Sequence, residues 1–273
     1  MIDHRLITYV TIVRLGSFTK ASEVLHLTQP AISKQMKSLQ EEQGMLFVHL
    51  HHNSFSLTSF GKRFYEIGSR LLLLEENAKK ELESLKKGIQ IIRIGYESKF
   101  KYSKILKNLS KLTLNHPNIQ LKLMEVQEED IAKSLEDLSF HYVISSNGSL
   151  DKGIKDRLLY IDPYMGYSSF DSHGFTLNEV KKLPLLTLDG YKRHRGLHYQ
   201  MILDDLSLLE KVIREGYVAI LPRNIWIDHE DIYRHEIKGM NLKEEAHLLC
   251  LNEFDPPYEE EIVSLSLLNA SNF

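Results

Sequence analysis

The N-terminal part of the chain, up to about Gln43, carries apolar side chains at helical spacing, and turn residues interrupt the pattern twice. Gly16 ends the first apolar run, and the hydroxyl of Ser17 can accept from the amides of the turn after it. Thr28 and Pro30 mark the second interruption, with Thr28 as a cap and Pro30 in the first turn, where its missing N–H costs nothing. Three short helices joined in this way have the size and punctuation of a helix-turn-helix.

A single long helical pattern follows from Thr58 to Gly88. Its apolar side chains recur every three or four positions, at Phe60, Phe64, Ile67, Leu71, Leu74, Ala78, Leu82 and Leu85. An isolated helix cannot bury such a stripe by itself, so we expect it to pack against another helix. The most direct partner is the same helix of a second copy, which predicts a dimer. A core helix within one domain is the alternative.

From Ile89 onward, short aliphatic runs alternate with helical stretches. Strands are expected over residues 89–94, 119–126, 142–145, 158–160, 166–168, 185–188, 218–221 and 246–251. Helices are expected over residues 101–115, 129–138, 175–182, 204–215 and 259–268. Strands separated by helices of this length predict parallel βαβ units in an α/β body.

Composition limits the class of protein. The chain has 273 residues, of which 42% are hydrophobic and 26% charged, as in globular proteins, so a wholly disordered chain is excluded. Its longest aliphatic run, Leu71 to Leu74, is too short to span a membrane. The N-terminus shows none of the sections of a secretory signal, so we expect a cytoplasmic protein.

Charge is distributed unevenly along the chain. The net charge is −3, but the first 88 residues hold 12 Lys and Arg against 9 Asp and Glu, and the remainder is acidic. A mildly basic head on an acidic body is typical of a modular protein. The one cysteine, Cys250, lies in an apolar run and is expected to be a buried strand thiol rather than a nucleophile.

Two sequence runs resemble the winged helix-turn-helix of LysR-type transcriptional regulators. They are Phe18 to Leu39, which reads FTKASEVLHLTQPAISKQMKSL, and Leu57-Thr58-Ser59-Phe60-Gly61. Runs similar to those of the family's effector domain occur at residues 92–95, 116–121 and 216–222. The resemblance therefore covers the whole chain.

This resemblance implies an α/β protein with an all-α N-terminal part. Its expected domains are a winged helix-turn-helix at 1–58, a dimerising linker helix at 59–88 and a two-subdomain, periplasmic-binding-protein-like effector domain at 89–273. The expected subdomains are residues 89–148 with 248–273, and residues 149–247.

The implied function is regulation of transcription. Such a protein binds double-stranded promoter DNA as a homodimer or homotetramer, and a small-molecule effector changes that binding; RNA polymerase is a further candidate partner. No cofactor, metal or membrane is implied, and the expected location is the cytoplasm, at the nucleoid.

In the family pattern the third helix enters the major groove of DNA. The residues that this places nearest to DNA are Thr28, Gln29, Pro30, Ser33, Lys34 and Lys37. Gln29 can pair with adenine through two hydrogen bonds, Ser33 can reach a base edge or phosphate, and lysine can bind guanine or phosphate. A merely solvated face is the alternative interpretation of Lys34 and Lys37.

The wing departs from the family because residues 45–56 hold no Lys or Arg. Three histidines stand there instead, of which His49 and His52 are our candidates for contact with phosphate. His49 and His51 alternate onto one strand face, so metal binding is a rival interpretation. A helix-turn-helix that no longer binds DNA is another.

Candidate effector ligands follow the strands of the body, where open α/β sheets bind their ligands. They are Ser98, Lys99, Ser145, Ser146, Asn147 and Asp189. The hydroxyls of Ser98 and Ser146 could meet a carboxylate or hydroxyl, or could cap the local turn. Where family members often carry Asp before the third strand, this chain has His141.

The basic run from Lys192 to Arg195 could bind an anionic effector near Asp189, or form a solvated loop. His194 and His198 have the spacing of a helical metal pair, although Gly196 weakens that helix.

Two other classes of protein remain as alternatives. A small-molecule enzyme would need a catalytic motif, and the chain has no Gly-x-Ser-x-Gly, phosphate-binding or dinucleotide-binding signature. A plain solute-binding protein would need export and has no use for the first 88 residues.

The histidine-bearing wing predicts that DNA binding depends on pH. Histidine has an unperturbed pKa of about 6.5, so attraction between the wing and phosphate is expected to be stronger at pH 6 than at pH 8. Gel shifts and footprints on the DNA upstream of the protein's own gene, at both pH values and with bulk competitor DNA, measure this. Equal affinity at the two pH values would contradict it.

Overall fold

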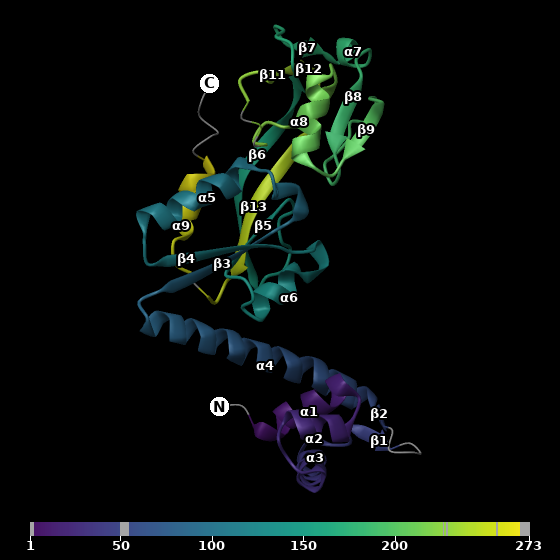
Figure 1. Ribbon diagram of the computed structural model, residues 1–273, viewed down its shortest axis with the longest axis vertical. Helices are drawn as coiled ribbons and strands as arrows, with labels where there is room; N and C mark the ends of the chain where they lie inside the picture. Colours follow the sequence, from purple (N-terminus) through teal and green to yellow (C-terminus); the bar gives the residue numbers. More distant parts are fainter. Residues whose placement is uncertain (1–2, 50–54, 226, 228, 255, 268–273) are drawn as a thin grey trace. The chain divides into compact units, whose positions relative to one another are not determined.

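The computed structural model describes residues 3–49, 55–225, 227, 229–254 and 256–267. The chain forms two compact units, Met1–Lys86 and Lys87–Phe273 (Figure 1). Among the described residues, none of the helices combines the length and the apolar character needed to cross a membrane.

The first unit begins with three helices, α1 (His4–Leu15), α2 (Phe18–Val24) and α3 (Gln29–Gln43). Gly16 ends α1 at a φ of 63°, a left-handed conformation that favours glycine. The hydroxyl of Ser17 accepts from Lys20 N at 3.2 Å, and that of Thr28 accepts from Ala31 N at 3.4 Å. These caps confirm the helix starts predicted at Ser17 and Thr28.

Two short strands and a long helix complete this unit. β1 (Phe47–His49) and β2 (Phe55–Leu57) pair antiparallel, and α4 (Ser59–Lys86) follows. Tyr9 and Phe47 are buried together in the core, with ring centroids 5.3 Å apart.

Helix α4 carries an apolar stripe that the core of the first unit covers only in part. Phe64 and Leu72 pack on the core of the first unit. Other members of the predicted stripe remain exposed in the single chain, among them Ile67, Leu71 and Leu82, which is 59% exposed. The helix therefore belongs partly to the domain core and still offers an apolar surface along its length.

The second unit is built on one mixed sheet of nine strands. Its first lobe contains β3 (Gln90–Tyr96), β4 (Ile119–Glu125), β5 (Tyr142–Ser145), α5 (Lys104–Asn115), α6 (Ile131–Glu136) and α9 (Glu259–Leu267). Residues of α5 and α9 share a hydrophobic core with β3 and β5, whereas α6 packs in a separate cluster with Val143 and Leu249. Short 3-10 helices precede α5 and α6, at Ser98–Phe100 and Glu128–Asp130.

The second lobe contains β8 (Leu185–Leu188), β9 (Tyr199–Leu203), β10 (Val218–Pro222), β11 (Tyr233–His235) and α8 (Leu206–Arg214). A small parallel pair, β7 (Phe175–Thr176) and β12 (Ile237–Lys238), lies beside α7 (Leu177–Val180). Leu209 and Ile213 of α8 are buried in the core of this lobe.

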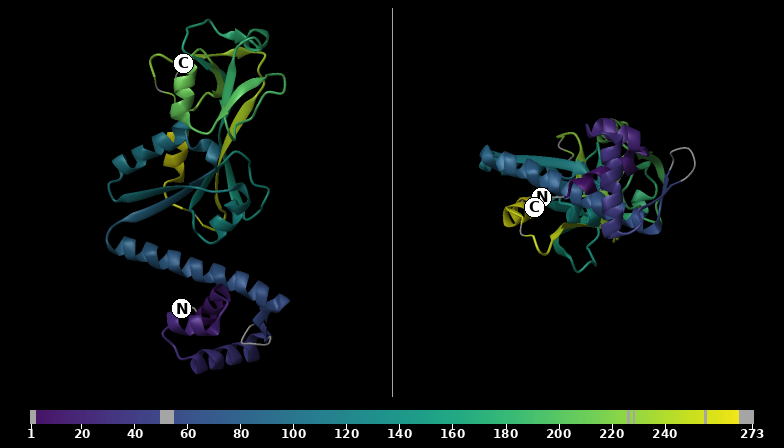
Figure 2. Two further views of the ribbon diagram at one scale, coloured as in Figure 1. Left: turned by 45° about the vertical axis from the view of Figure 1, so that its right-hand side comes forward. Right: turned by 90° about the horizontal axis from the view of Figure 1, so that it is seen from below.

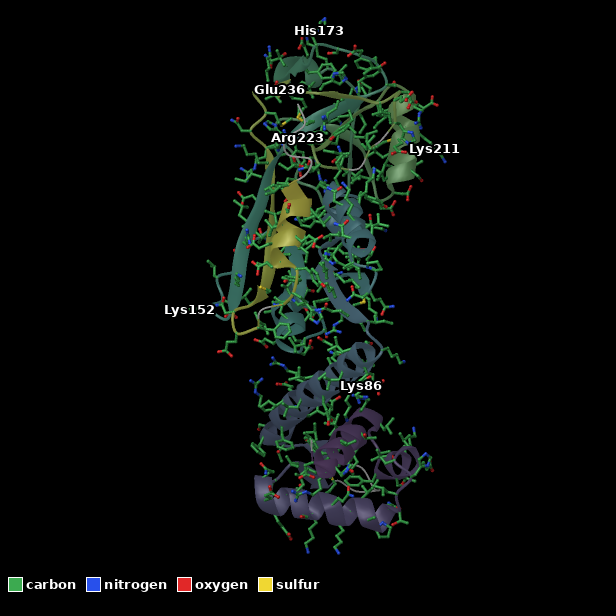
Figure 3. The ribbon with its side chains drawn as sticks, turned by 90° about the vertical axis from the view of Figure 1, so that its left-hand side faces the viewer. Lys86, Lys152, His173, Lys211, Arg223 and Glu236 are labelled. Carbon is green, nitrogen blue, oxygen red and sulfur yellow. The ribbon has the colours of Figure 1, made fainter. Side chains whose placement is uncertain are left out.

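Two long strands, β6 (Ile154–Ser168) and β13 (Lys243–Leu251), run between the lobes (Figure 2). Residues 154–163 of β6 pair antiparallel with β13, and residues 164–167 pair with β10. Figure 3 shows Lys152, just before β6, and His173, beyond its other end, at opposite ends of the second unit. β6 and β13 thus make one sheet out of two lobes.

Some predicted elements need correction. The two strands expected at 158–160 and 166–168 are parts of one strand, which continues through Pro163. The expected parallel pairing is confirmed for β3 with β4 and β5 and for β8 with β10, and β9 also pairs parallel with β8. It is wrong for β6, which pairs antiparallel with β13 and β10. The helix expected over 175–182 is limited to residues 177–180, and β9 was not predicted at all. Cys250 is buried in β13, as predicted.

Gly61 generates a prediction for the stability of the first unit. A Cβ atom at this position would lie 2.2 Å from the carbonyl oxygen of Leu46, whereas a Cβ at Gly68 would meet side-chain atoms, a methyl of Leu6 at 2.7 Å and a methyl of Val10 at 3.3 Å. We expect Gly61→Ala to lower the free energy of unfolding by about 2–3 kcal/mol, and Gly68→Ala by less, because a leucine side chain can move more easily than backbone. Urea unfolding of the full chain, followed by hydrogen exchange in peptides from α1 and α3, measures the effect. Equal losses for the two variants would contradict this ranking.

Candidate functional site

Helix α3 has one buried and one exposed side. Ile32, Met36 and Leu39 are buried, with exposed fractions of 3% or less. The residues predicted to approach DNA, Thr28, Gln29, Pro30, Ser33, Lys34 and Lys37, are all exposed. The exposed side therefore presents an amide, hydroxyls and two ammonium groups, which can bind base edges and phosphates.

Polar side chains on the other sides of α3 hold the helix in place. Thr8 of α1 donates to the side chain of Gln35 at 2.6 Å. The side-chain oxygen of Gln40 accepts from the backbone of Leu46 and Phe47, at 3.1 and 3.0 Å. These hydrogen bonds fix α3 against α1 and against the start of the wing, and Gln35 and Gln40 were not singled out in the sequence.

The candidate wing residues are only partly described. His49 is the last residue of β1 and pairs with Phe55 of β2. His51 and His52 lie outside the described residues. Contact between the wing and DNA, and the rival interpretation of a metal site, therefore stay predictions.

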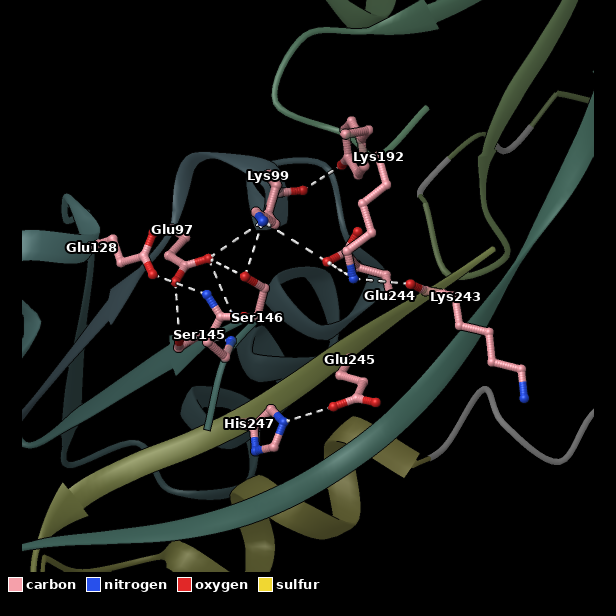
Figure 4. Close-up of polar contacts among 12 residues, drawn as sticks. Glu97, Lys99, Glu128, Ser145, Ser146, Lys192, Lys243, Glu244, Glu245 and His247 are labelled. Atoms are coloured by element: carbon pink, nitrogen blue, oxygen red, sulfur yellow. Dashed lines mark hydrogen bonds and ion pairs between the residues drawn. The ribbon is translucent and has the colours of Figure 1, made fainter. Parts of the chain in front are cut away.

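In the second unit, a buried carboxylate connects the segment after β3 with the C-terminal end of β5. Glu97 is 6% exposed and accepts from the hydroxyls of Ser145 and Ser146 at 2.7 and 2.8 Å (Figure 4). The backbone N–H of Ser146 donates to the same carboxylate at 3.2 Å. The two candidate serines thus both donate to Glu97, which follows β3.

Lys99 connects this carboxylate to a second one. Its ammonium donates to the hydroxyl of Ser146 at 2.9 Å and lies 3.8 Å from both Glu97 and Glu244. The hydroxyl of Tyr191 donates to the carbonyl of Lys99. The side chain of Lys99 thus lies between Glu97 of the first lobe and Glu244 of β13, and its backbone carbonyl accepts a hydrogen bond from Tyr191 of the second lobe.

A small cavity, open to solvent, lies between the two lobes. Its lining comprises Lys99, Phe100, Ser103, Tyr160, Asp162, Tyr191, Pro222, Asn224, Ile225 and Glu244. Asp162 and Glu244 were not predicted, because acidic residues in a strand usually face water. Their burial, to 1% and 3% exposure, follows from the pairing of β6 with β13.

Burial also sets the protonation behaviour of this cavity. It raises the pKa of Asp162 to about 6, although the N–H of Asn224 and the guanidinium of Arg223 act in the opposite direction. Burial likewise raises the pKa of Tyr160 and Tyr191 above the usual range. The tyrosines therefore stay neutral at physiological pH, whereas Asp162 titrates near it.

The remaining candidates have other surroundings. Ser98 is exposed at the start of its 3-10 turn, and Asn147 donates to Glu128 at 2.9 Å. Asp189 is 71% exposed and lies 3.9 Å from Arg193. The structure thus brings Lys99, Ser145 and Ser146 together and places Asn147 and Asp189 at the surface.

Two residues of the basic run from Lys192 to Arg195 contact two different carboxylates. The ammonium of Lys192 lies 3.3 Å from Glu244, and the guanidinium of Arg193 faces Asp189. The residues from 194 to 198 are not helical, so the helical metal pair considered for His194 and His198 does not form. His141, in the position before β5, is buried with a ring nitrogen 2.7 Å from Arg93.

The known sequences that this chain resembles are transcriptional regulators. Residues 4–62 match the family described as "Bacterial regulatory helix-turn-helix protein, lysR family". The HTH-type transcriptional regulator CfxR of Cupriavidus necator is 29% identical over 214 residues, which cover 76% of this chain and 67% of that protein. The regulator YtlI of Bacillus subtilis is 44% identical over 89 residues, covering 32% of this chain and 29% of that protein.

A probable RuBisCO transcriptional regulator of Trieres chinensis is 30% identical over 61% of this chain, and the match spans about half of its own length, 55%.

Solved structures share the fold of the whole chain. The structure of full-length CbnR complexed with its target DNA matches with a TM-score of 0.64 at 18% identity, covering 97% of this chain and 99% of that one. Full-length BenM matches with a TM-score of 0.51 at 19% identity, over 97% of this chain and 95% of that one. The HTH-type transcriptional regulator BenM of Acinetobacter baylyi is 23% identical over 221 residues, which cover 81% of this chain and 68% of that protein.

The raised pKa of Asp162 predicts a pH-dependent gain in stability for Asp162→Asn. The native state binds the proton of Asp162 more tightly than the unfolded chain does, so its ionisation destabilises the fold above about pH 6 and has no effect below about pH 4. We expect Asp162→Asn to raise the free energy of unfolding by about 2–3 kcal/mol at pH 8, and by little at pH 4. Urea unfolding of the full chain at both pH values measures it, with the exposed Asp189→Asn as the control. A gain of equal size at both pH values would contradict the assignment.

Proposed function

We propose that this chain, whose residues 4–62 match the LysR family of bacterial helix-turn-helix regulators, is a transcriptional regulator of that family and that α3 of its first unit binds the major groove of promoter DNA. The observation that carries this proposal is the exposed face of α3, because Gln29, Ser33 and Lys34 lie on it with no core contact of their own. Gln29 and Ser33 would read base edges, while Lys34 and Lys37 would bind guanine or phosphate. The wing, with His49 and His52, would contact the adjoining phosphates.

The proposed domains follow the same interpretation. Residues 1–58 form the DNA-binding domain, 59–88 the linker helix and 89–273 the effector domain, with subdomains at 89–148 with 248–273 and at 149–247. The exposed apolar side chains of α4, such as Ile67 and Leu82, support packing against the same helix of a second copy. A dimer or tetramer would then present α3 helices at spaced half-sites, and RNA polymerase would be a further partner at the promoter.

The second unit would bind a small molecule and transmit its presence. The cavity between the lobes, with Lys99 on its wall, supports a ligand site there. The further candidate residues, which lie outside its lining, are Ser98, Ser145, Ser146, Asn147 and Asp189. A ligand that favours one arrangement of the lobes changes the free energy of DNA binding by its difference in affinity for the arrangements. Regulation by binding, without turnover of the ligand, in the cytoplasm at the nucleoid, is the activity that we propose.

Substitutions on α3 test this function. We expect Gln29→Ala and Ser33→Ala to relax sequence preference, because their side chains read bases, and Lys34→Ala to weaken binding evenly across sequences. The loss for a base contact is expected to be about 1–3 kcal/mol at the cognate sequence. Quantitative footprinting on the DNA upstream of the gene measures both effects.

The matched control is Lys111→Ala, which removes an exposed lysine of the effector domain. It is expected to leave the footprint unchanged. If all three α3 variants bind like the parent protein, the groove assignment is wrong. If the folded parent protects no DNA, this helix-turn-helix has lost its binding function.

A further inference from the structure

Two buried carboxylates face each other where the chain passes between the lobes. Asp162 of β6 and Glu244 of β13 are direct partners in the antiparallel register. They are 1% and 3% exposed. Like charges directly opposite each other destabilise a strand pair, and burial adds to that cost. This arrangement is therefore unfavourable for the fold alone.

Each carboxylate uses one oxygen and leaves the other without a hydrogen-bond donor. Asp162 Oδ2 accepts from Asn224 N at 2.7 Å, and Glu244 Oε2 accepts from the hydroxyl of Tyr164 at 2.9 Å. Within the described part of the chain, Asp162 Oδ1 and Glu244 Oε1 have no hydrogen bond. Buried side-chain oxygens are nearly always hydrogen-bonded in native proteins, so these two atoms are open to a donor from outside the chain, which a water molecule or a ligand group can supply.

The cations near these oxygens do not replace that donor. Arg223 Nε lies 3.7 Å from Asp162 Oδ1. The ammonium groups of Lys192 and Lys99 lie 3.3 and 3.8 Å from Glu244 Oε1 (Figure 4). These contacts are ion pairs whose lengths or angles fall outside hydrogen-bond geometry. Lys99 is also shared with Ser146 and Glu97, which limits its approach to Glu244.

The rest of the cavity wall fits the same kind of donor. Phe100, Tyr160 and Tyr191 line it with aromatic rings, and Pro222 and Ile225 add apolar surface. Aromatic rings and carboxylates together are the groups that bind ammonium and guanidinium ions. The charged residues of the lining are Asp162, Glu244 and Lys99, and Arg223 and Lys192 stand next to the two carboxylates outside the lining.

We infer that the effector of this protein carries a protonated amine or guanidine, whose N–H groups donate to Asp162 Oδ1 and Glu244 Oε1. The inference rests on the proposed function of the second unit as an effector domain, and it names the ligand class of that site. Because Asp162 and Glu244 stand on the two strands that join the lobes, such a ligand binds at the point where their arrangement is set.

Calorimetric titration of the full-length protein tests the ligand class. The probes are putrescine and agmatine, as a diamine and a guanidine, with succinate as a matched dicarboxylate without nitrogen. We expect at least one of the two cations to bind at millimolar concentration or below, and succinate to bind more weakly or not at all. Asp162→Asn and Glu244→Gln should each weaken binding of the cation by about tenfold or more, since each removes a negative charge but keeps an acceptor oxygen.

Glu245→Gln is the matched control. Glu245 is the next residue of β13, half exposed, and its carboxylate contacts His247 at 3.3 Å outside the cavity lining. It should bind the cation like the parent protein. Urea unfolding of each variant verifies that it is folded, and Asp162→Asn is expected to be more stable than the parent at pH 8.

The possible results separate this inference from the proposed function. Binding of succinate in preference to both cations, binding of none of the probes, or equal affinity in the parent and the two cavity variants would overturn the ligand class. A cation that binds, is lost in the two cavity variants and leaves the footprint on DNA unchanged would support the ligand class and contradict regulation. Absence of any DNA footprint would contradict the proposed function while the titration still decides the ligand class.

Discussion

The antiparallel pairing of β6 with β13 is the constraint on which the second unit depends, because it makes two lobes share one sheet. β6 pairs with β13 up to Pro163 and with β10 beyond it. Pro163 has no N–H to donate, and its carbonyl accepts from Arg223 N at 2.9 Å. The partner of the strand therefore changes at this residue, and the cavity lies beside that change. Asp162 and Glu244, which line this cavity, are opposite each other because of the register of β6 and β13, and not because of the sequence around either residue.

The first unit depends on a similar contact at short range. Gly61 lets the start of α4 approach the backbone of Leu46, and the hydroxyl of Tyr9 donates to the carbonyl of Gly61 at 2.6 Å. The hydroxyl of Thr58 accepts from Gly61 N at 2.8 Å, so the same turn also begins the helix. These contacts join α1, the wing and α4 in one core, against which the buried side of α3 packs. The exposed side of α3 is thereby held on a rigid base, which a DNA-reading helix needs.

Local signals in the sequence predicted the elements well, and signals that depend on distant pairing were missed. Ser17, Thr28 and Gly16 act within one turn of themselves, so the helix boundaries that they mark could be read directly. The continuity of β6 could not, because Asp156, Arg157 and Pro163 interrupt its apolar pattern. Burial of Glu97, Asp162 and Glu244 depends on partners that are far away in the sequence. Lys99, Ser145 and Ser146 could be proposed from the rule that ligands bind beyond strand ends, and their contact with an effector stays a prediction.

The buried acids at the junction of the lobes have an energetic consequence for regulation. A buried carboxylate with an unused oxygen destabilises the arrangement in which it is buried, and a ligand that brings a positive charge and a donor removes that penalty. A ligand of the inferred class would therefore favour the arrangement in which these acids are buried, by the amount of the penalty that it relieves. Because a ligand can shift an equilibrium only by its difference in affinity for the two states, the penalty at Asp162 and Glu244 sets the scale of the response. Under the inference drawn above, two opposed acids at the place where an apolar pair would stabilise the sheet more would cost stability and would give the ligand a penalty to relieve.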